Sequence, residues 1–224
     1  IEECEPNLKS LLPQIWKCSD TCLVKLSPML DIQQAIQQLG QVQAVFIYSY
    51  KNECKELLFL LKKGSQEEPV IHCINETSQG KEEFTFRYSK EQAHTLQYEA
   101  ADAFILDPNV SILKAGAFKL PCKQFPIHKL AANTHLYTSA ELVANFPGRQ
   151  FKVLEELSMK KCKLNKANVI CKNYHLNAEA FKKKYGIQEG GSDFILAYRD
   201  EAGKSKVLLC QLVSSNGEAI FNPR

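Results

Sequence analysis

The sequence predicts a protein of mixed α/β and α+β class, and three observations lead to this expectation. Residues 1–90 alternate between helix and strand patterns, residues 91–150 change character, and residues 151–224 read as βαβαββ. Of the 224 residues, 45% are hydrophobic and 24% are charged, which is typical of globular proteins and excludes disordered and fibrous classes. We therefore expect three parts, with boundaries near residues 90 and 150.

The first part contains three predicted helices and four predicted strands. Apolar residues at helical spacing mark segment 6–16, although Pro13 interrupts it, and Asp31 begins a helix that Gly40 ends. Segment 52–61 also reads as a helix. Strands are predicted at residues 21–26, 42–50, 69–75 and 83–88. This alternation favours a parallel sheet with right-handed crossovers.

The start of the chain looks like the last part of a larger α/β domain. The pattern begins with a helix, and a parallel sheet needs earlier strands and cover on both faces. The first residue is Ile rather than Met, so we expect a C-terminal fragment. Its acidic first residues do not resemble a signal peptide, and no apolar run reaches the roughly 18 residues of a membrane span, so we expect a cytoplasmic protein without membrane contact.

The middle and last parts are predicted from caps, turns and alternation. Asp107 is expected to cap a helix over 110–120 with Pro108 at its first position, and a short helix is expected to end at Asn145. A lysine-rich helix is expected at 159–166 and another at 177–185. Strands are predicted at residues 134–137, 151–157, 167–174, 193–198 and 206–213.

Charge is unevenly distributed along the chain. Residues 1–150 carry 15 basic and 17 acidic side chains, a net of −2, whereas residues 151–224 carry 13 and 8, a net of +5. Clustered Lys and Arg side chains release counterions from phosphates, so the basic part is where a polyanion is expected to bind. The alternative interpretation is that these lysines cover a solvent-exposed face that binds no ligand, which explains the same net charges.

Cysteines and histidines give little sign of catalysis. Nine cysteines are an odd number, and several lie in apolar runs, so we interpret them as small core residues in a reducing compartment. Cys18 and Cys22 have no second pair to complete a zinc site, and no metal is expected. His72 lies in a predicted buried strand and reads as a core histidine. No phosphate-binding glycine loop or catalytic signature occurs.

Two groups of residues remain candidates for function. The first lies where two predicted parallel strands end, at the edge where α/β sheets bind ligands, and comprises Lys25, Ser27, Pro28, Asn52 and Glu53. The second joins lysine, amide and aromatic side chains that can grip phosphate and stack on a base. It comprises His135, Tyr137, Arg149, Lys172, Asn173 and Tyr174. Loop ends and caps explain the first group equally, and a solvated surface or buried turn explains the second.

Six short motifs in order resemble one family. They are Lys25-Leu-Ser-Pro-Met-Leu-Asp31, Asn52-Glu-Cys-Lys-Glu-Leu-Leu58, Asp107-Pro-Asn-x-x-x-x-Lys-Ala-Gly116, His135-Leu-Tyr-Thr-Ser139, Phe146-Pro-Gly-Arg149 and Gly190-Gly-x-Asp193. Together they resemble the C-terminal half of class I S-adenosylmethionine-dependent methyltransferases with a ferredoxin-like insert and a THUMP-like domain, as found in Bacteroidetes-type bacteria. The resemblance spans essentially the whole chain.

The resemblance implies the end of a Rossmann-like methyltransferase sheet in residues 1–90, a ferredoxin-like connection in 91–150 and a THUMP-like domain in 151–224. It implies a late antiparallel strand, expected at residues 69–75. The cofactor loop and the acidic ribose-binding residue of such enzymes lie upstream, so S-adenosylmethionine is expected in the full-length parent and not in this fragment. The implied partner is RNA.

Departures from the family pattern limit what the resemblance predicts. The last domain of the family often has an Arg-Asn-Phe-Pro-like strand end, where this chain has Lys172-Asn-Tyr-His175. A non-catalytic module for protein contacts, or for homodimerisation through residues 1–90, is the alternative to an RNA methyltransferase fragment. A methyltransferase with a protein or small-molecule substrate is a third interpretation.

Overall fold

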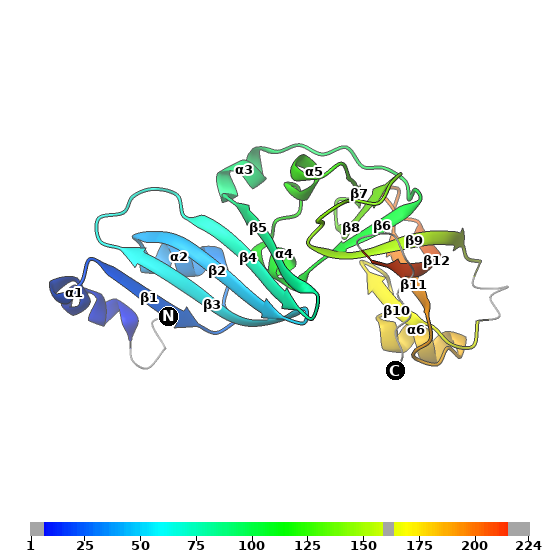
Figure 1. Ribbon diagram of the computed structural model, residues 1–224, viewed down its shortest axis with the longest axis horizontal. Helices are drawn as coiled ribbons and strands as arrows, with labels where there is room; N and C mark the ends of the chain where they lie inside the picture. The colour runs from blue at the N-terminus through cyan, green and yellow to red at the C-terminus, as the bar shows by residue number, and fades with distance from the viewer. Residues whose placement is uncertain (1–6, 159–163, 215–224) are drawn as a thin grey trace. The chain divides into compact units, whose positions relative to one another are not determined.

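The computed structural model describes residues 7–158 and 164–214, and Figure 1 shows its helices and strands. The chain divides into two compact units. Unit 1 contains residues 1–93 and 109–117, and unit 2 contains residues 94–108 and 118–224. Each unit is built on one mixed sheet. The predicted class, an α/β sheet followed by an α+β part, is confirmed.

Unit 1 is a five-stranded sheet in the order β1-β3-β2-β4-β5. Strand β3 runs antiparallel to both of its neighbours, and β2 and β4 form the one parallel pair of the described sheet. The strands are β1 Thr21–Leu26, β2 Val42–Tyr50, β3 Glu53–Lys62, β4 Val70–Thr77 and β5 Gly80–Phe86, and the helices are α1 Leu8–Cys18, α2 Ile32–Leu39, α3 Tyr88–Ala93 and α4 Val110–Ala115.

The predicted helix at residues 52–61 is wrong, because this segment is strand β3. Lys51 and Asn52 have φ of 50° and 61° and connect β2 to β3 as a two-residue hairpin turn. Such turns need positive φ at both positions, a conformation that asparagine tolerates. The run that follows alternates in burial, with Leu57, Phe59 and Leu61 fully buried. A period of two is that of a strand.

The hairpin also changes the sheet topology. Strands β1 and β2 run in the same direction, as predicted, but β3 lies between them and pairs with both. The expectation of a parallel sheet therefore holds only for β2 and β4. The late antiparallel strand is not at residues 69–75, since β4 pairs in parallel with β2.

Capping residues define helix α2 as predicted. The Asp31 carboxylate accepts a hydrogen bond from the Gln34 N–H at 2.8 Å, and Gly40 closes α2 with φ of 61°. Helix α2 buries Ile32, Ala35 and Leu39. Helix α1 begins after Asn7 and contains Pro13, and none of its described residues is buried. Its stability therefore depends less on packing than that of α2.

Unit 2 is a seven-stranded sheet in the order β10-β11-β12-β9-β6-β8-β7. All described pairings are antiparallel except that of β10 with β11. The elements are β6 Phe104–Pro108, α5 Pro121–Gln124, β7 His128–Ala131, β8 Thr134–Ser139, β9 Gly148–Glu156, β10 Asn168–Lys172, α6 Ala178–Tyr185, β11 Asp193–Arg199 and β12 Ser205–Val213.

Strand β11 is buried on both faces. Phe194, Leu196 and Tyr198 belong to a core that also contains residues of β6, β8 and β9. Ile195 and Ala197 face the opposite way, into a core that contains Phe181 of α6. Alternation along a strand sends neighbouring side chains to opposite faces, so one strand joins both cores.

Two predictions for residues 107–145 are wrong. Asp107 and Pro108 end strand β6, and Asn109 caps α4, which stops at Ala115. Gly116 terminates it with φ of 75°, a left-handed conformation that favours glycine. The segment 139–145 is not helical. Its backbone is held instead by the buried Gln150 side chain, which donates to the Val143 carbonyl and accepts from the Val143 N–H.

The last part of the chain follows the prediction closely. Asn177 caps α6, and the β11–β12 hairpin turns at residues 200–204. Strands β9 and β10 lie near their expected positions. Residues 159–163 of the predicted lysine-rich helix lie outside the described residues, and residues 164–166 are not helical.

Candidate functional site

The predicted rim residues of unit 1 lie at one edge of its sheet. Strands β1 and β2 run in the same direction and end at Leu26 and Tyr50, so the residues that follow them share this edge. Ser27 and Pro28 form a tight turn, in which the Ser27 hydroxyl accepts from the Met29 N–H and the Ser27 carbonyl accepts from the Leu30 N–H. This turn connects β1 to α2.

The charged rim residues form exposed ion pairs. Lys25 lies 3.2 Å from Glu56, and its side chain is 67% exposed. Glu53 lies 2.7 Å from Lys55. Exposed pairs of this kind contribute little to stability and leave neither charge in a low-dielectric site. They offer no activated acid or base.

Asn52 belongs to a hydrogen-bonded set that we call the amide network, made of Asn52, Asn75, Glu82 and Asn109. The Asn52 N–H donates to Asn75 Oδ1 at 3.0 Å, and Asn52 Oδ1 accepts from the Val110 N–H at 2.7 Å. The amides of Asn75 and Asn109 both donate to Glu82 Oε2, at 2.9 and 2.8 Å. The network connects the start of α4 to the sheet, so the role of Asn52 in this structure is structural.

A second polar set lies in unit 2, and we call it the Asp107 cluster: Asp107, His135, Arg149 and Lys172. The Asp107 side chain is 3% exposed, and Arg149 Nη2 donates to its Oδ2 at 2.6 Å. Lys172 Nζ lies 3.1 Å from Oδ1 as an ion pair, although the angles do not make it a hydrogen bond. Two cations face one buried carboxylate, so this pairing leaves a net positive charge.

His135 lies in the field of these cations. Its ring stacks on Phe118 with centroids 3.7 Å apart, and its buried Nδ1 has no hydrogen-bond partner among the described residues. Burial, together with the smaller effect of the charges of Lys129 and Lys172, lowers the pKa of His135 to about 4. At neutral pH the imidazole is therefore uncharged, and Nδ1 is a polar atom with unused capacity.

Lys129 is a charged residue that sequence reasoning missed. It lies on β7 with 1% exposure, and its Nζ donates to the carbonyls of Ala131 and Ala132 at 2.6 and 2.5 Å. Asp107 was also missed as a site residue, because it was interpreted as a helix cap. The only sequence feature that marks Lys129 or Asp107 is a single charge within an apolar stretch. This feature does not show which group the charged side chain binds.

Three other predicted residues are engaged in the fold. Tyr137 is fully buried, and its hydroxyl donates to the Phe118 carbonyl at 2.8 Å. The Asn173 amide lies 3.4 Å from the Thr134 hydroxyl. Tyr174 is partly buried, with its ring centroid 5.8 Å from that of Phe181. The structure thus brings Arg149 and Lys172 together on Asp107, places His135 in the electrostatic field of Lys172, and places the Tyr137 ring in the core.

Two hollows open in unit 2. One of about 390 Å³ is lined by Arg149, by residues of β10, β11 and β12, and by the Gly190–Gly191 loop. The other, of about 360 Å³, is lined by Glu99, Asp102, His128 and Glu141 among others. The first contains the Arg149 guanidinium and the Glu189 carboxylate, whereas the second contains three carboxylates and the His128 imidazole, so the second is the more acidic.

Thiol and metal chemistry find little support in the described residues. Burial raises the pKa of Cys171 to about 11 and that of Cys210 to about 12, so neither thiol is ionised at neutral pH. No disulfide joins the described cysteines, and no three ligand-type side chains gather there to hold a metal ion. His72 is only partly buried on β4 and stacks on Phe46, so the expectation of a core histidine is wrong. Within the described residues, no helix is long and apolar enough to span a bilayer.

Comparisons with known proteins divide unit 2 further. A family model described as a ferredoxin-like domain matches residues 104–147, and one described as THUMP domain-like matches residues 148–212. The boundary falls where β9 begins, and β9 pairs with β6 across it, so both matches share one sheet. No curated protein matches the sequence.

A solved structure resembles nearly the whole chain. It is the crystal structure of a protein from Porphyromonas gingivalis W83 described as a "putative methyltransferase", with a TM-score of 0.89 and 29% sequence identity. The similarity covers 95% of this chain and 56% of that one. The chain therefore spans little more than half the length of this similar protein.

Proposed function

We propose that the chain is part of an S-adenosylmethionine-dependent methyltransferase that modifies RNA, and that unit 2 binds the RNA. The observation that carries the proposal is the similarity, over 95% of the chain, to a structure described as a "putative methyltransferase". The THUMP-like match over residues 148–212 supports RNA as the substrate class. It falls on the part of the chain that is basic by sequence.

The topology of unit 1 is compatible with the end of a methyltransferase sheet. Strand β3 runs antiparallel between β1 and β2, which is the kind of late antiparallel strand that the family resemblance implies. The rim residues of this unit do not fit the cofactor itself. Their charges are paired on the surface, and Asn52 is committed to α4. No catalytic step is therefore assigned to residues of this chain.

A calorimetric titration tests the placement of the cofactor. We expect no measurable heat of binding when S-adenosylmethionine is added to this chain, because the rim offers neither a glycine loop nor an acidic ribose partner. The titration should be repeated on a longer chain that includes the upstream residues, where binding is expected. Micromolar affinity for the shorter chain would contradict this part of the proposal.

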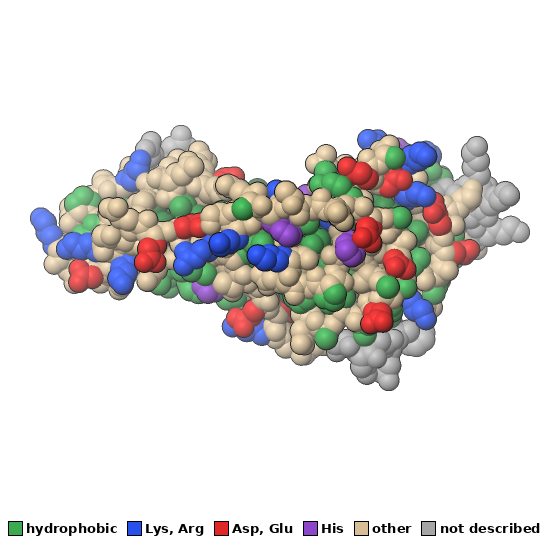
Figure 2. All heavy atoms as spheres, turned by 90° about the horizontal axis from the view of Figure 1, so that it is seen from above, with side chains coloured by type: hydrophobic (Ala, Val, Ile, Leu, Met, Phe, Trp, Pro, Cys, Tyr) green, Lys and Arg blue, Asp and Glu red, His purple; other side chains and the backbone are tan. Residues whose placement is uncertain are grey.

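The Asp107 cluster is the proposed contact with the RNA backbone. Arg149 and Lys172 together exceed the charge of Asp107, and their side chains are 41% and 27% exposed, so both remain within reach of a ligand. Arg and Lys side chains bind phosphate oxygens through charge-assisted hydrogen bonds. Over the face seen in Figure 2, basic and acidic side chains are interspersed. The proposal therefore rests on this cluster rather than on a broad basic surface.

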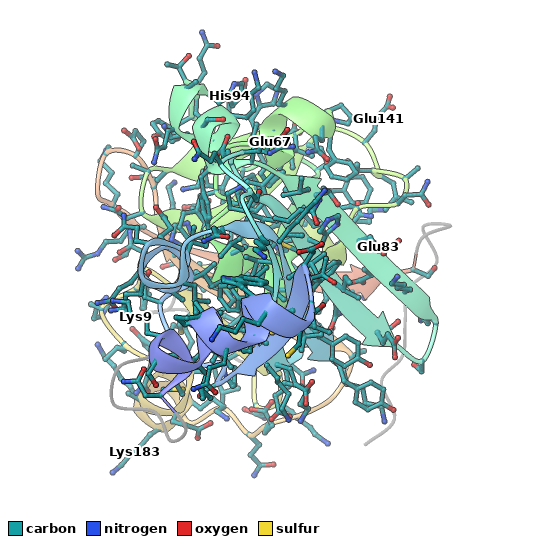
Figure 3. All side chains as sticks on the ribbon, turned by 90° about the vertical axis from the view of Figure 1, so that its left-hand side faces the viewer. Lys9, Glu67, Glu83, His94, Glu141 and Lys183 are labelled. Carbon is teal, nitrogen blue, oxygen red and sulfur yellow. The ribbon has the colours of Figure 1, made fainter. Side chains whose placement is uncertain are left out.

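Fluorescence anisotropy with a structured RNA tests this contact. We expect binding to weaken as the salt concentration rises from about 50 to about 200 mM, because phosphate contacts release counterions. Lys172→Ala is expected to weaken binding several-fold. The matched control is Lys183→Ala, which removes the same charge from the outer face of α6 (Figure 3) and should change affinity little. Absence of RNA binding even at low salt would contradict the proposal.

An association surface at β1 is the second candidate function. No described residue of α1 or β1 is buried, Leu23 is 60% exposed, and β1 pairs with β3 alone among the described strands. Unpaired strand edges readily pair with another strand. If two copies associate here, the mass from light scattering should rise with concentration, and Leu23→Lys should abolish the rise. A monomer at all concentrations would exclude homodimerisation through this edge.

A further inference from the structure

We propose that the 390 Å³ hollow beside Arg149 is a subsite for one unstacked nucleotide of single-stranded RNA, with its phosphate on Arg149 and its base against the apolar wall. This inference rests on the proposed RNA-binding function and specifies where and how unit 2 engages the strand. It is independent of the methyltransferase chemistry.

The wall of the hollow combines apolar and polar surface. Ile170 of β10 and Leu212 of β12 are partly buried and pack against the core that contains Phe194. Asn168 lines the hollow too, two residues from Ile170 on the same face of β10. An apolar wall with a few fixed polar groups is typical of small-ligand sites, and the volume lies within their usual range of about 300–1,000 Å³.

The opposite side of the hollow is a loop held in place before any ligand binds. Gly190 and Gly191 have φ of 109° and 85°, where other residues are strained. A side chain on Gly190 would lie 3.0 Å from the Lys166 side chain, so this loop approaches a further cation. The Asn168 amide donates to the Gly191 carbonyl at 2.9 Å. A preformed wall lowers the entropic cost of binding.

The electrostatics of the hollow favour an anion. The Arg149 guanidinium uses Nη2 for Asp107, while its buried Nε has no hydrogen-bond partner among the described residues. A buried donor without an acceptor is costly, and a phosphate oxygen is the acceptor that a guanidinium binds best. Glu189 also lines the hollow, but its carboxylate lies 2.5 Å from Lys182, which offsets its charge.

A nucleotide fits these features better than a free anion does. Phosphate alone would contact Arg149 and would not use the apolar surface that Ile170 and Leu212 present to the hollow. A base needs an apolar face, and single-stranded RNA presents bases that are free to leave the stack. The other hollow of unit 2 contains Glu99, Asp102 and Glu141, and these carboxylates disfavour the phosphate of a nucleotide.

Anisotropy titrations with two RNAs test the inference. The probes are a labelled single strand of about ten nucleotides, within the usual site size for such strands, and a fully paired blunt duplex. We expect the single strand to bind more tightly. Ile170→Trp fills the hollow without removing any charge of the Asp107 cluster and should weaken single-strand binding about fivefold or more, the lower end of what losing one stacked base costs.

Further variants separate the phosphate contact from general charge. Arg149→Lys keeps the charge but loses the planar fork, and we expect it to weaken single-strand binding as well. Lys183→Ala is the control and should leave it unchanged. A cooperative thermal unfolding transition well above the assay temperature would show that the variants fold. If Ile170→Trp does not fold, photo-crosslinking of a 4-thiouridine strand to the wild-type chain should label a peptide that contains residues 168–170 or 190–194.

The outcomes separate the two proposals. If wild-type protein binds neither RNA, the proposed function fails and this subsite fails with it. If it binds RNA but Ile170→Trp and Arg149→Lys bind equally well, the subsite is overturned while RNA binding stands. Crosslinks confined to other peptides would overturn the subsite in the same way.

Discussion

The amide network of unit 1 and the Asp107 cluster of unit 2 are both polar sets on a sheet, but they differ in how fully their atoms are used. In the amide network each asparagine Oδ1 accepts a hydrogen bond, and Glu82 accepts two amide donors on one oxygen. In the Asp107 cluster, the buried Arg149 Nε and His135 Nδ1 have no hydrogen-bond partner among the described residues.

This difference separates structural from binding groups. A saturated network stabilises one arrangement and gains nothing from a ligand. Buried atoms without partners destabilise the unliganded protein, and a ligand that supplies the missing partner recovers that free energy. The comparison therefore predicts that changes in the amide network alter stability alone, whereas changes in the Asp107 cluster alter stability and RNA binding together.

The largest effect on stability is expected from Asp107→Ala. This change leaves Arg149 and Lys172 beside each other without their buried counter-charge, and we expect the free energy of unfolding to fall by about 3 kcal/mol, the lower end for breaking a buried ion pair because both partners are partly exposed. Urea unfolding followed by circular dichroism measures it. Glu179→Gln removes an exposed carboxylate from the same unit and should cost about 0.5 kcal/mol or less. Equal values for the two variants would contradict the importance of the cluster.

A smaller loss is expected from Asn109→Ala. The substitution removes the cap of α4 and one donor to Glu82, so we expect a loss of about 2 kcal/mol in unfolding free energy. Asn177→Ala is the matched control, since Asn177 caps α6 through a single bond to the Ala180 N–H, and it should cost about 1 kcal/mol. RNA affinity should be unchanged in Asn109→Ala. A large decrease in affinity would break the distinction between the two sets.

A modest pH effect is expected from His135. Its pKa in the folded protein is lowered from 6.5 to about 4, chiefly by burial, so the unfolded chain takes up the proton first as pH falls. Folding stability should therefore decrease from about pH 6.5 down to about pH 4, and His135→Gln should show a weaker decrease. The His135 ring resonance in an NMR titration should have its midpoint near pH 4. A midpoint near 6.5 would show that the imidazole is solvated.

The smallest effect is expected from Lys25→Ala. The ion pair of Lys25 with Glu56 is exposed on both sides, so its removal should change the unfolding free energy by about 0.5 kcal/mol or less. Thermal or urea unfolding measures this change. A loss above about 1 kcal/mol would mean that the rim is more tightly structured than exposed ion pairs usually are.

Local sequence signals predicted the elements that depend on local interactions. Asp31, Asn177 and Gly40 marked helix ends correctly because a cap satisfies backbone groups within one turn. The hairpin of β11 and β12 followed from two apolar runs and a short polar turn. Strand β3 was missed because its first residues are good helix formers, while its burial alternates only in contact with β1 and β2.

The candidate residues divide in the same way. Arg149, Lys172 and His135 were predicted from residue type and position, but their common partner Asp107 was interpreted as a helix cap. Asp107 and Lys172 are 65 residues apart in the sequence. They form an ion pair because β6 and β10 belong to the same sheet. No local pattern carries information about a contact of that range.

By itself, the sequence determined the class of the fold, the basic C-terminal part and the ends of helices α2 and α6, because composition, charge and capping act over a few residues. The tertiary structure alone decided which polar atoms are satisfied. It buried Lys129 against two carbonyls, gave partners to Oδ1 of Asn52 and to the amide of Asn109, and left Nε of Arg149 and Nδ1 of His135 without partners among the described residues. Hydrogen-bond satisfaction depends on the positions of atoms from distant strands, and these positions exist only once the sheets have formed.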